Sequence, residues 1–259
     1  MDLLTVTGLL LGWMAILVGA KLEGLRLDSL LKVSAFCIVG VGTVAAACTG
    51  FTMEQLKGFP EALKRCFSPG KQKAADIIPV ITGYAKKARH SGLLILEPEL
   101  KIQKDPFFRK SLQLLIDGNS IDDVKTIMES ELSIWEEQEK IYEKFLRAMG
   151  GFSPTLGIIG TVMGLIHVMG NLGEPDKIAT GIATAFIATF YGVSFANLIF
   201  LPLAAKLKAR REEALVIKEM ILAGVLSIGS GDSSLIVMEK LCTYLNEEDR
   251  ARLMAKKNY

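Results

Sequence analysis

Four long stretches of the chain contain no Asp, Glu, Lys or Arg, and each is bounded by charged residues or turn signals. They cover residues 3–20, 33–53, 152–172 and 178–205. About 20 consecutive apolar residues let a helix cross the ~30 Å hydrocarbon core of a bilayer. The pattern therefore predicts an all-α integral membrane protein with four spans.

The first apolar stretch has a second interpretation, as a cleaved signal peptide. No basic residue precedes it, and no small-residue cleavage pattern with a polar continuation follows it. A further apolar stretch begins soon afterwards, so we expect a retained spanning helix. The second stretch is rich in Gly, Ala, Cys and Thr, which is typical of a helix that packs closely against its neighbours.

The remaining segments alternate amphipathic helix patterns with turn signals. Ser120 is placed to cap a helix that leads almost directly into the third span, so we expect one long helix there. A turn is predicted at Ser68-Pro69-Gly70, and a break at Gly229-Ser230-Gly231-Asp232. The predicted helices cover residues 53–66, 74–90 (interrupted near Pro79), 99–117, 121–149, 206–223 and 233–245.

Charge is segregated along the 259 residues, although the total of 30 basic and 28 acidic residues is nearly balanced. Residues 51–150 contain 16 Lys and Arg, and residues 206–259 contain ten more. Basic residues beside spans mark the cytoplasmic side, so we expect both termini and the long loop to be cytoplasmic. The predicted domains are spans one and two (1–52), a cytoplasmic helical domain (53–150), spans three and four (151–205) and a cytoplasmic tail (206–259).

Composition excludes several classes of protein. Half of the residues are hydrophobic and mean hydropathy is +0.36, which excludes a disordered chain. The four cysteines have neither disulfide nor metal-ligand spacing, so we expect unreactive thiols and no metal. No catalytic Ser/His/Asp set and no phosphate-binding glycine loop followed by Lys is present, so we expect neither an enzyme nor a cofactor, and no nucleic-acid partner.

Small residues form stripes along the last two spans. The third span places Gly157, Gly160 and Gly164 three and four residues apart, with Thr161 beside them. The fourth repeats small residues every four positions at Thr184, Ala188, Gly192 and Ala196, with Thr189 alongside. Such stripes let two helices approach closely, and packing alone explains the glycines. Pro154 and Pro202 each permit a kink, which serves as a hinge or merely as a bend.

The apolar stretches carry no carboxylate, and His167 is the one histidine in them. An intramembrane proton relay usually needs a carboxylate. If this chain lines an ion path, a partner must therefore supply the acid. His167 has two interpretations, as a proton carrier or as a histidine satisfied by a neighbouring carbonyl.

Four segments together resemble the MotA/PomA subunits of bacterial flagellar stators. They cover residues 88–97 (Ala-Arg-His-Ser-Gly-Leu-Leu-Ile-Leu-Glu), 153–166, 190–197 and 201–208. The resemblance implies five copies around two copies of MotB, whose single spans carry an aspartate, in the cytoplasmic (inner) membrane. Ion flow through that assembly turns the ring and drives a rotor switch-complex protein.

The resemblance also implies roles for individual residues. Thr161 and Thr189 match threonines that face the ion path, and Pro154 and Pro202 match coupling and hinge prolines. Arg89 and Glu97 match charged residues that engage the rotor, whereas His90 stands where many relatives have a second basic residue. Gly157, Gly160, Gly164 and Gly192 are expected to pack helices.

Two questions stay open at this point. Hydroxyl oxygens suit sodium as a hard cation, yet some proton-type members share a threonine, and we favour protons as the commoner case. An alternative function is that of an ExbB/TolQ-like energiser of an envelope system, although those proteins have three spans. A passive four-span scaffold or sensor would leave the paired Thr and Gly faces unexplained.

Overall fold

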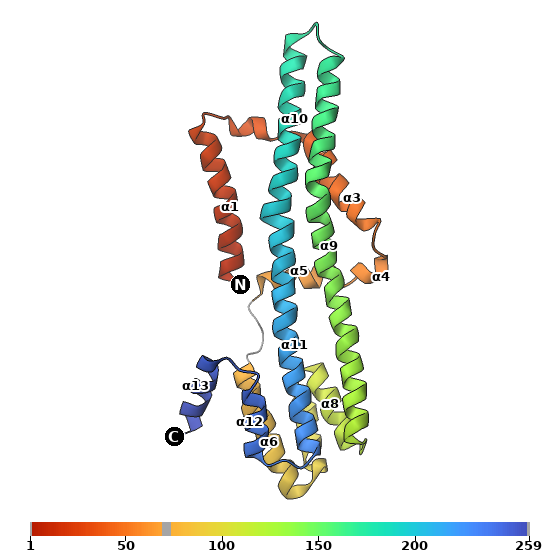
Figure 1. Cartoon of the computed structure of the whole chain (residues 1–259), viewed down its shortest axis with the longest axis vertical. Helices are drawn as coiled ribbons and strands as arrows, with labels where there is room; N and C mark the ends of the chain where they lie inside the picture. Colours follow the sequence, from red (N-terminus) through yellow and green to blue (C-terminus); the bar gives the residue numbers. More distant parts are fainter. Residues whose placement is uncertain (1, 69–73, 258–259) are drawn as a thin grey trace. The chain divides into compact units, whose positions relative to one another are not determined.

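The computed structural model describes residues 2–68 and 74–257, and every regular element in these ranges is helical (Figure 1). The α-helices are α1 (Leu3–Leu22), α2 (Val33–Phe36), α3 (Gly42–Cys48), α4 (Met53–Leu56), α5 (Phe59–Phe67), α6 (Ala74–Ser91), α7 (Glu97–Ile102), α8 (Pro106–Ile116), α9 (Ile121–Met169), α10 (Pro175–Phe195), α11 (Leu201–Gly229), α12 (Ser234–Cys242) and α13 (Glu247–Lys257). Short 3₁₀ turns cover Leu27–Leu30 and Leu93–Leu96, and π-helical turns cover Cys37–Val41 and Ala196–Phe200.

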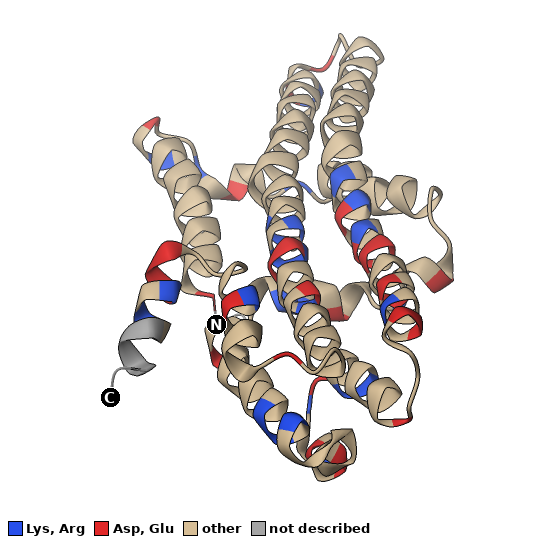
Figure 2. Ribbon diagram, turned by 60° about the horizontal axis from the view of Figure 1, so that its bottom comes forward, with Lys and Arg blue, Asp and Glu red and all other residues tan. Residues whose placement is uncertain are grey.

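Four helical runs are long and apolar enough to cross a membrane, which confirms the predicted all-α, four-span fold. They are Leu3–Leu22, Leu27–Cys48, Ile121–Met169 and Pro175–Gly229. The last two continue well beyond the apolar stretches, because the adjoining polar segments are also helical. Charged residues occupy the polar parts of α9 and α11 and are absent from most of α10 (Figure 2).

The chain divides into two compact units. The membrane unit contains residues 1–69 and 138–210, and the second unit contains residues 70–137 and 211–259. Both α9 and α11 contribute to each unit. The domain boundaries expected from sequence stay a prediction, since this division follows packing rather than the membrane surface.

Two apolar clusters hold the membrane unit together. The first joins spans two and four, where the Tyr191 hydroxyl donates to the Leu30 carbonyl at 2.5 Å. Its buried members are Ala35, Val39, Ile187, Ala188 and Tyr191. The second surrounds α5, and its buried members are Ala47, Ala62, Cys66, Phe145, Leu146, Met149, Leu203, Ala204 and Leu207.

Burial determines the chemistry of the α5 thiol. It raises the pKa of Cys66 to about 11, against the opposing effect of nearby cations such as Lys206 and Arg65. The thiol is therefore protonated at neutral pH. All four cysteines are free.

The second unit has a core of its own, with Ile78, Ile81, Leu112, Met128 and Ile221 fully or almost fully buried. At its edge, the Lys218 ammonium lies 4.5 Å from the centre of the Phe107 ring and 5.0 Å from that of Trp135. A cation held between two aromatic rings links α8, α9 and α11 within this unit.

The helix predicted over residues 53–66 is broken in the structure. It separates into α4 and α5 at Gly58, where a Cβ atom would lie 2.2 Å from the Tyr142 hydroxyl oxygen. A side chain at this position would have to displace the tip of the Tyr142 ring on α9. Span two also ends earlier than predicted, at Cys48, and Thr52 then caps α4 in a capping box with Gln55.

Two further predictions about prolines were wrong. Helix α6 is continuous through Pro79, because buried isoleucines on both sides of it offset the lost backbone hydrogen bond. The helix predicted over residues 99–117 is instead divided into α7 and α8. There Pro106 occupies the first turn of α8, and the Asp105 carboxylate accepts from the Phe108 N–H at 3.0 Å.

The predicted cap at Ser120 and the predicted break at residues 229–232 are confirmed, whereas α11 runs past its predicted end at 223 and α12 ends at Cys242, before the predicted 245. Ser120 accepts from the Asp123 N–H at 3.1 Å at the start of α9, which runs unbroken into the third span. Helix α11 ends at Gly229, and Gly231 adopts a φ of 73° in the break before α12. Pro69 and Gly70 of the predicted turn lie outside the described residues.

Candidate ion-path site

Two threonine hydroxyls meet where α9 and α10 cross. Thr161 Oγ1 lies 2.5 Å from Thr189 Oγ1 and 3.0 Å from each of the carbonyl oxygens of Gly157 and Ala185. Both threonines are half-buried within the chain. The structure therefore brings together the two residues that the sequence placed on separate helices.

The protons at this site have few possible arrangements. A hydroxyl has one proton, so when Thr161 donates to a carbonyl it accepts from Thr189. Thr189 then keeps both oxygen lone pairs, while Thr161 keeps one. The pair thus presents acceptor oxygens toward the half-exposed side, which is the chemistry that binds a cation or a hydrated proton.

Glycines make this close crossing possible. A Cβ atom at Gly157 would lie 3.0 Å from the Ala188 carbonyl oxygen, and one at Gly160 would lie 2.5 Å from the Ala188 Cβ. A Cβ at Gly192 would lie 2.7 Å from the Ser153 carbonyl oxygen. With no room for a methyl group at these positions, the two backbones touch.

Ser153 is a contact residue that sequence reasoning missed. Its buried hydroxyl donates to the Gly192 carbonyl at 2.9 Å and ties the two helices together about two turns before Thr161 on α9 and one turn after Thr189 on α10. The signal was present, because Ser153 continues the small-residue stripe of Gly157, Gly160 and Gly164.

The site has no carboxylate of its own. Near the other end of the third span, His167 is exposed, and its backbone carbonyl accepts from the Asn171 side chain at 2.7 Å. Within residues 2–68 and 74–257, no group of three or more His, Cys, Asp or Glu side chains is placed to hold a metal ion.

The two prolines lie at different kinds of position. Pro154 is inside α9, which continues through it, and its Cα lies 3.2 Å from the position of a Cβ at Gly192. Pro202 is the second residue of α11, which directly follows the π-helical turn Ala196–Phe200. Both prolines therefore lie within continuous helical runs that carry the threonines.

The charged residues predicted to contact a rotor belong to the second unit. Arg89 and His90 are exposed in the last turn of α6, and Glu97 is exposed at the start of α7. Gly92, with a φ of 81°, makes the turn between the two helices, and Lys87 pairs with Glu99 at 2.5 Å across it. The loop also exposes Leu94, an apolar residue that sequence reasoning had not singled out.

Comparisons with known proteins identify the family. A model of the MotA/TolQ/ExbB proton channel family matches residues 99–220. Motility protein A of Bacillus subtilis is 30% identical over 97% of this chain and 94% of its own length. Chemotaxis protein PomA of Vibrio alginolyticus is 32% identical over 97% of this chain and 98% of its own. The chain belongs to the MotA/PomA family of flagellar stator subunits.

The structure agrees with this assignment. A solved structure of C. jejuni MotAB matches with a TM-score of 0.90 and 30% identity, over 95% of this chain and 97% of that one. The predicted resemblance and function are thus confirmed: the chain is a stator subunit of the flagellar motor, a family of channel and motor type. The names of these relatives favour the flagellar function over the ExbB/TolQ alternative.

The helix crossing gives a direct test of the glycine contact. Gly164→Ala would place a Cβ 2.8 Å from the Gly181 carbonyl oxygen, so α9 and α10 must separate. We expect a loss of about 1–3 kcal/mol in the free energy of unfolding, as for other overpacked contacts. Thermal unfolding of the purified chain in detergent measures it.

Gly151→Ala is the matched control, because nothing lies within 4 Å of a Cβ at Gly151. Alanine favours a helix over glycine by about 1 kcal/mol, so this variant should be as stable as the parent or more so. Equal behaviour of the two variants would contradict the packing explanation.

Proposed function

We propose that the chain conducts ions together with a single-span MotB-type partner and that ion flow through the pair produces torque on the flagellar rotor. The observation that carries this proposal is the Thr161–Thr189 hydroxyl pair, which lies in a helix contact free of carboxylates. Similarity to MotAB structures supports the partner.

The partner supplies the charge that the site lacks. A cation in the middle of a bilayer is costly unless an anion or several oxygen ligands replace its water. In this proposal an aspartate in the partner's span approaches Thr161 and Thr189, whose oxygens take the place of part of the hydration shell. We favour protons as the ion, with sodium as the alternative that hydroxyl oxygens also suit.

The assembly is proposed to contain five copies of the chain around two partners in the inner membrane, with both termini in the cytoplasm. An even number of spans supports placing the termini on one side, and the basic residues after the fourth span support the cytoplasmic side. Native mass spectrometry of the purified complex measures the copy numbers.

Arg89, His90 and Glu97 are proposed to face the rotor. Their exposure and opposite charges suit electrostatic engagement, which is fast to form and easy to release. Pro154 and Pro202 are proposed to be the points at which the two helices bend during the cycle, since each removes a backbone hydrogen bond.

The function itself is tested by deleting the gene in a strain that carries no other member of this family. Filaments should still assemble while rotation stops, because the stator supplies torque and not structure. Restoring the chain should restore rotation of tethered cells. Unchanged rotation after deletion would refute the proposal.

The hydroxyl of Thr189 is tested by Thr189→Val, which keeps the shape and removes the oxygen. We expect rotation to slow about tenfold or more, the cost of losing one hydrogen-bonding group to a charge. Thr189→Ser, which keeps the oxygen, should retain most of the speed. Rotation is measured against sodium concentration, with and without a protonophore, so the same series identifies the ion.

Thr155→Val serves as the control on the same membrane unit. Thr155 is exposed on α9 and its hydroxyl donates to the Phe152 carbonyl at 2.8 Å, away from the threonine pair. Loss of speed in this control equal to that in Thr189→Val would contradict a specific role for the site.

The rotor surface is tested by Arg89→Glu. We expect torque to fall while the complex still assembles, and a compensating charge reversal on the rotor protein to recover part of it. Arg109→Glu changes the same charge on an exposed residue of α8 and should leave torque unchanged. Stable Arg89→Glu protein with full torque would exclude electrostatic engagement at this position.

A further inference from the structure

One stretch of the fourth span departs from regular α-helix. A π-helical turn covers Ala196–Phe200, and Pro202 follows it after one residue. Proline has no N–H, so the carbonyl of Leu198, four residues earlier, lacks its usual α-helical partner. Residues 196–202 should therefore deform more easily than regular α-helix.

Helix α1 contacts this run on the α10 side of the deformable stretch and within it. A Cβ at Gly12 would lie 3.1 Å from Leu198 Cδ2, so the two helices touch there. The Trp13 ring packs with its centre 6.3 Å from that of Phe195. We call Gly12 and Trp13 the upper anchor.

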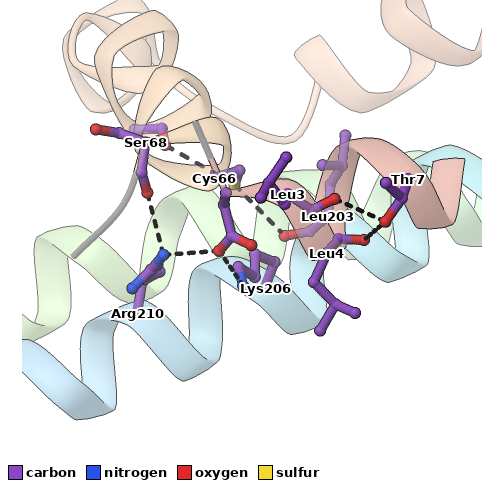
Figure 3. A network of polar contacts seen from close by, with 10 residues as sticks. Leu3, Leu4, Thr7, Cys66, Ser68, Leu203, Lys206 and Arg210 are labelled. Carbon is purple, nitrogen blue, oxygen red and sulfur yellow. Dashed lines mark hydrogen bonds and ion pairs between the residues drawn. The ribbon is translucent and has the colours of Figure 1, made fainter.

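Asp2, immediately before α1, contacts the same run beyond the stretch. Its Oδ2 lies 2.5 Å from Lys206 Nζ and 2.7 Å from Arg210 Nη2. Its N–H donates to the Phe67 carbonyl at 2.9 Å, and Arg210 also donates to the Ser68 carbonyl at 3.0 Å (Figure 3). We call this group the lower anchor.

The spacing of the anchors matches on the two helices. Asp2 and Gly12 are separated by about 15 Å along α1, at ~1.5 Å per residue. Leu198 is separated from Lys206 by about 12 Å and from Arg210 by about 18 Å on the same scale. Helix α1 thus runs antiparallel to span four and is attached to it on both sides of Pro202.

Besides the two anchors, α1 lies beside α5 and the turn Leu27–Leu30. None of its residues is buried, whereas the Asp2 side chain retains only 13% of its exposure. Because no residue of α1 is buried, its position along span four should depend on each of the two anchors.

We propose that α1 is a splint that bridges the deformable stretch of span four, with Asp2 as the lower anchor and Trp13 in the upper one. When residues 196–202 bend, α1 must either follow the end of span four or release Asp2. Asp2 is therefore a positioning residue: it limits how far this part of the helix can move.

The lower anchor persists at physiological pH. The hydrogen bond from Lys206 lowers the pKa of Asp2 below its ordinary value, against the opposing effect of burial. A lowered folded-state pKa gives stabilisation that is complete above the ordinary value and is lost only as the pH falls through the lowered one. The splint is thus a permanent attachment and not a cytoplasmic pH switch.

Hydrogen–deuterium exchange tests the splint independently of torque. The full chain, purified with its partner in lipid nanodiscs, is compared with Asp2→Asn, and exchange is followed in a peptide that covers residues 196–206. We expect exchange there to become roughly fivefold faster, as for loss of a partly exposed ion pair. Asp2→Glu, which keeps the charge that pairs with Lys206 and Arg210, should restore slow exchange.

Asp28→Asn is the matched control, because it removes the same charge beyond the other end of α1. Asp28 pairs only loosely with Arg26, at 3.7 Å. Exchange in residues 196–206 should be unchanged in this variant. Trp13→Ala releases the upper anchor without altering any charge and should also make exchange in residues 196–206 faster. This variant keeps the test possible if Asp2→Asn accumulates poorly. The double variant should add little, because a splint freed at one end no longer bridges.

Two outcomes would overturn the proposal. One is unchanged exchange of residues 196–206 in Trp13→Ala and in Asp2→Asn. The other is equal acceleration throughout the chain, which would mean general destabilisation. Because rotation is not measured, either outcome leaves the test of stator function intact.

Discussion

The close crossing of α9 and α10 is the interaction on which the rest of the site depends. Helices in lipid gain little from burying apolar surface against each other, so contact must come from close packing and hydrogen bonds. Here Gly157, Gly160 and Gly192 leave room for the neighbouring backbone. Thr161 can reach the Ala185 carbonyl on the other helix only because those methyl groups are missing.

The absence of charge follows from the same constraint. A carboxylate at this crossing would have to be paired or protonated in surroundings that offer it no cation. The chain instead provides neutral oxygens, which in the proposed function lower the cost of a passing ion without fixing one in place. Such a path would be incomplete in one chain, which is the physical reason why we propose a partner with an acid.

Features with a short sequence period could be predicted from the sequence. The four spans and the small-residue stripes follow from charge-free runs or from three- and four-residue spacing, whereas the pairing of Thr161 with Thr189 does not. The continuity of α6 through Pro79 and the break at Gly58 depend on packing partners distant in the sequence. Local propensity cannot reveal whether burial will outweigh one lost hydrogen bond.

The contact of Asp2 with Arg210 could not be predicted from the sequence either, because the two residues are 208 positions apart. From sequence, Lys206 and Arg210 indicate only which side of the membrane is cytoplasmic, because basic residues next to a span do so. Acidic residues contribute little to that rule, so the rule gives no reason to single out Asp2. Four spans place the start of the first and the end of the fourth at the same membrane surface. Lys206 and Arg210, whose charge predicts that this surface is cytoplasmic, are then in place to pair with Asp2.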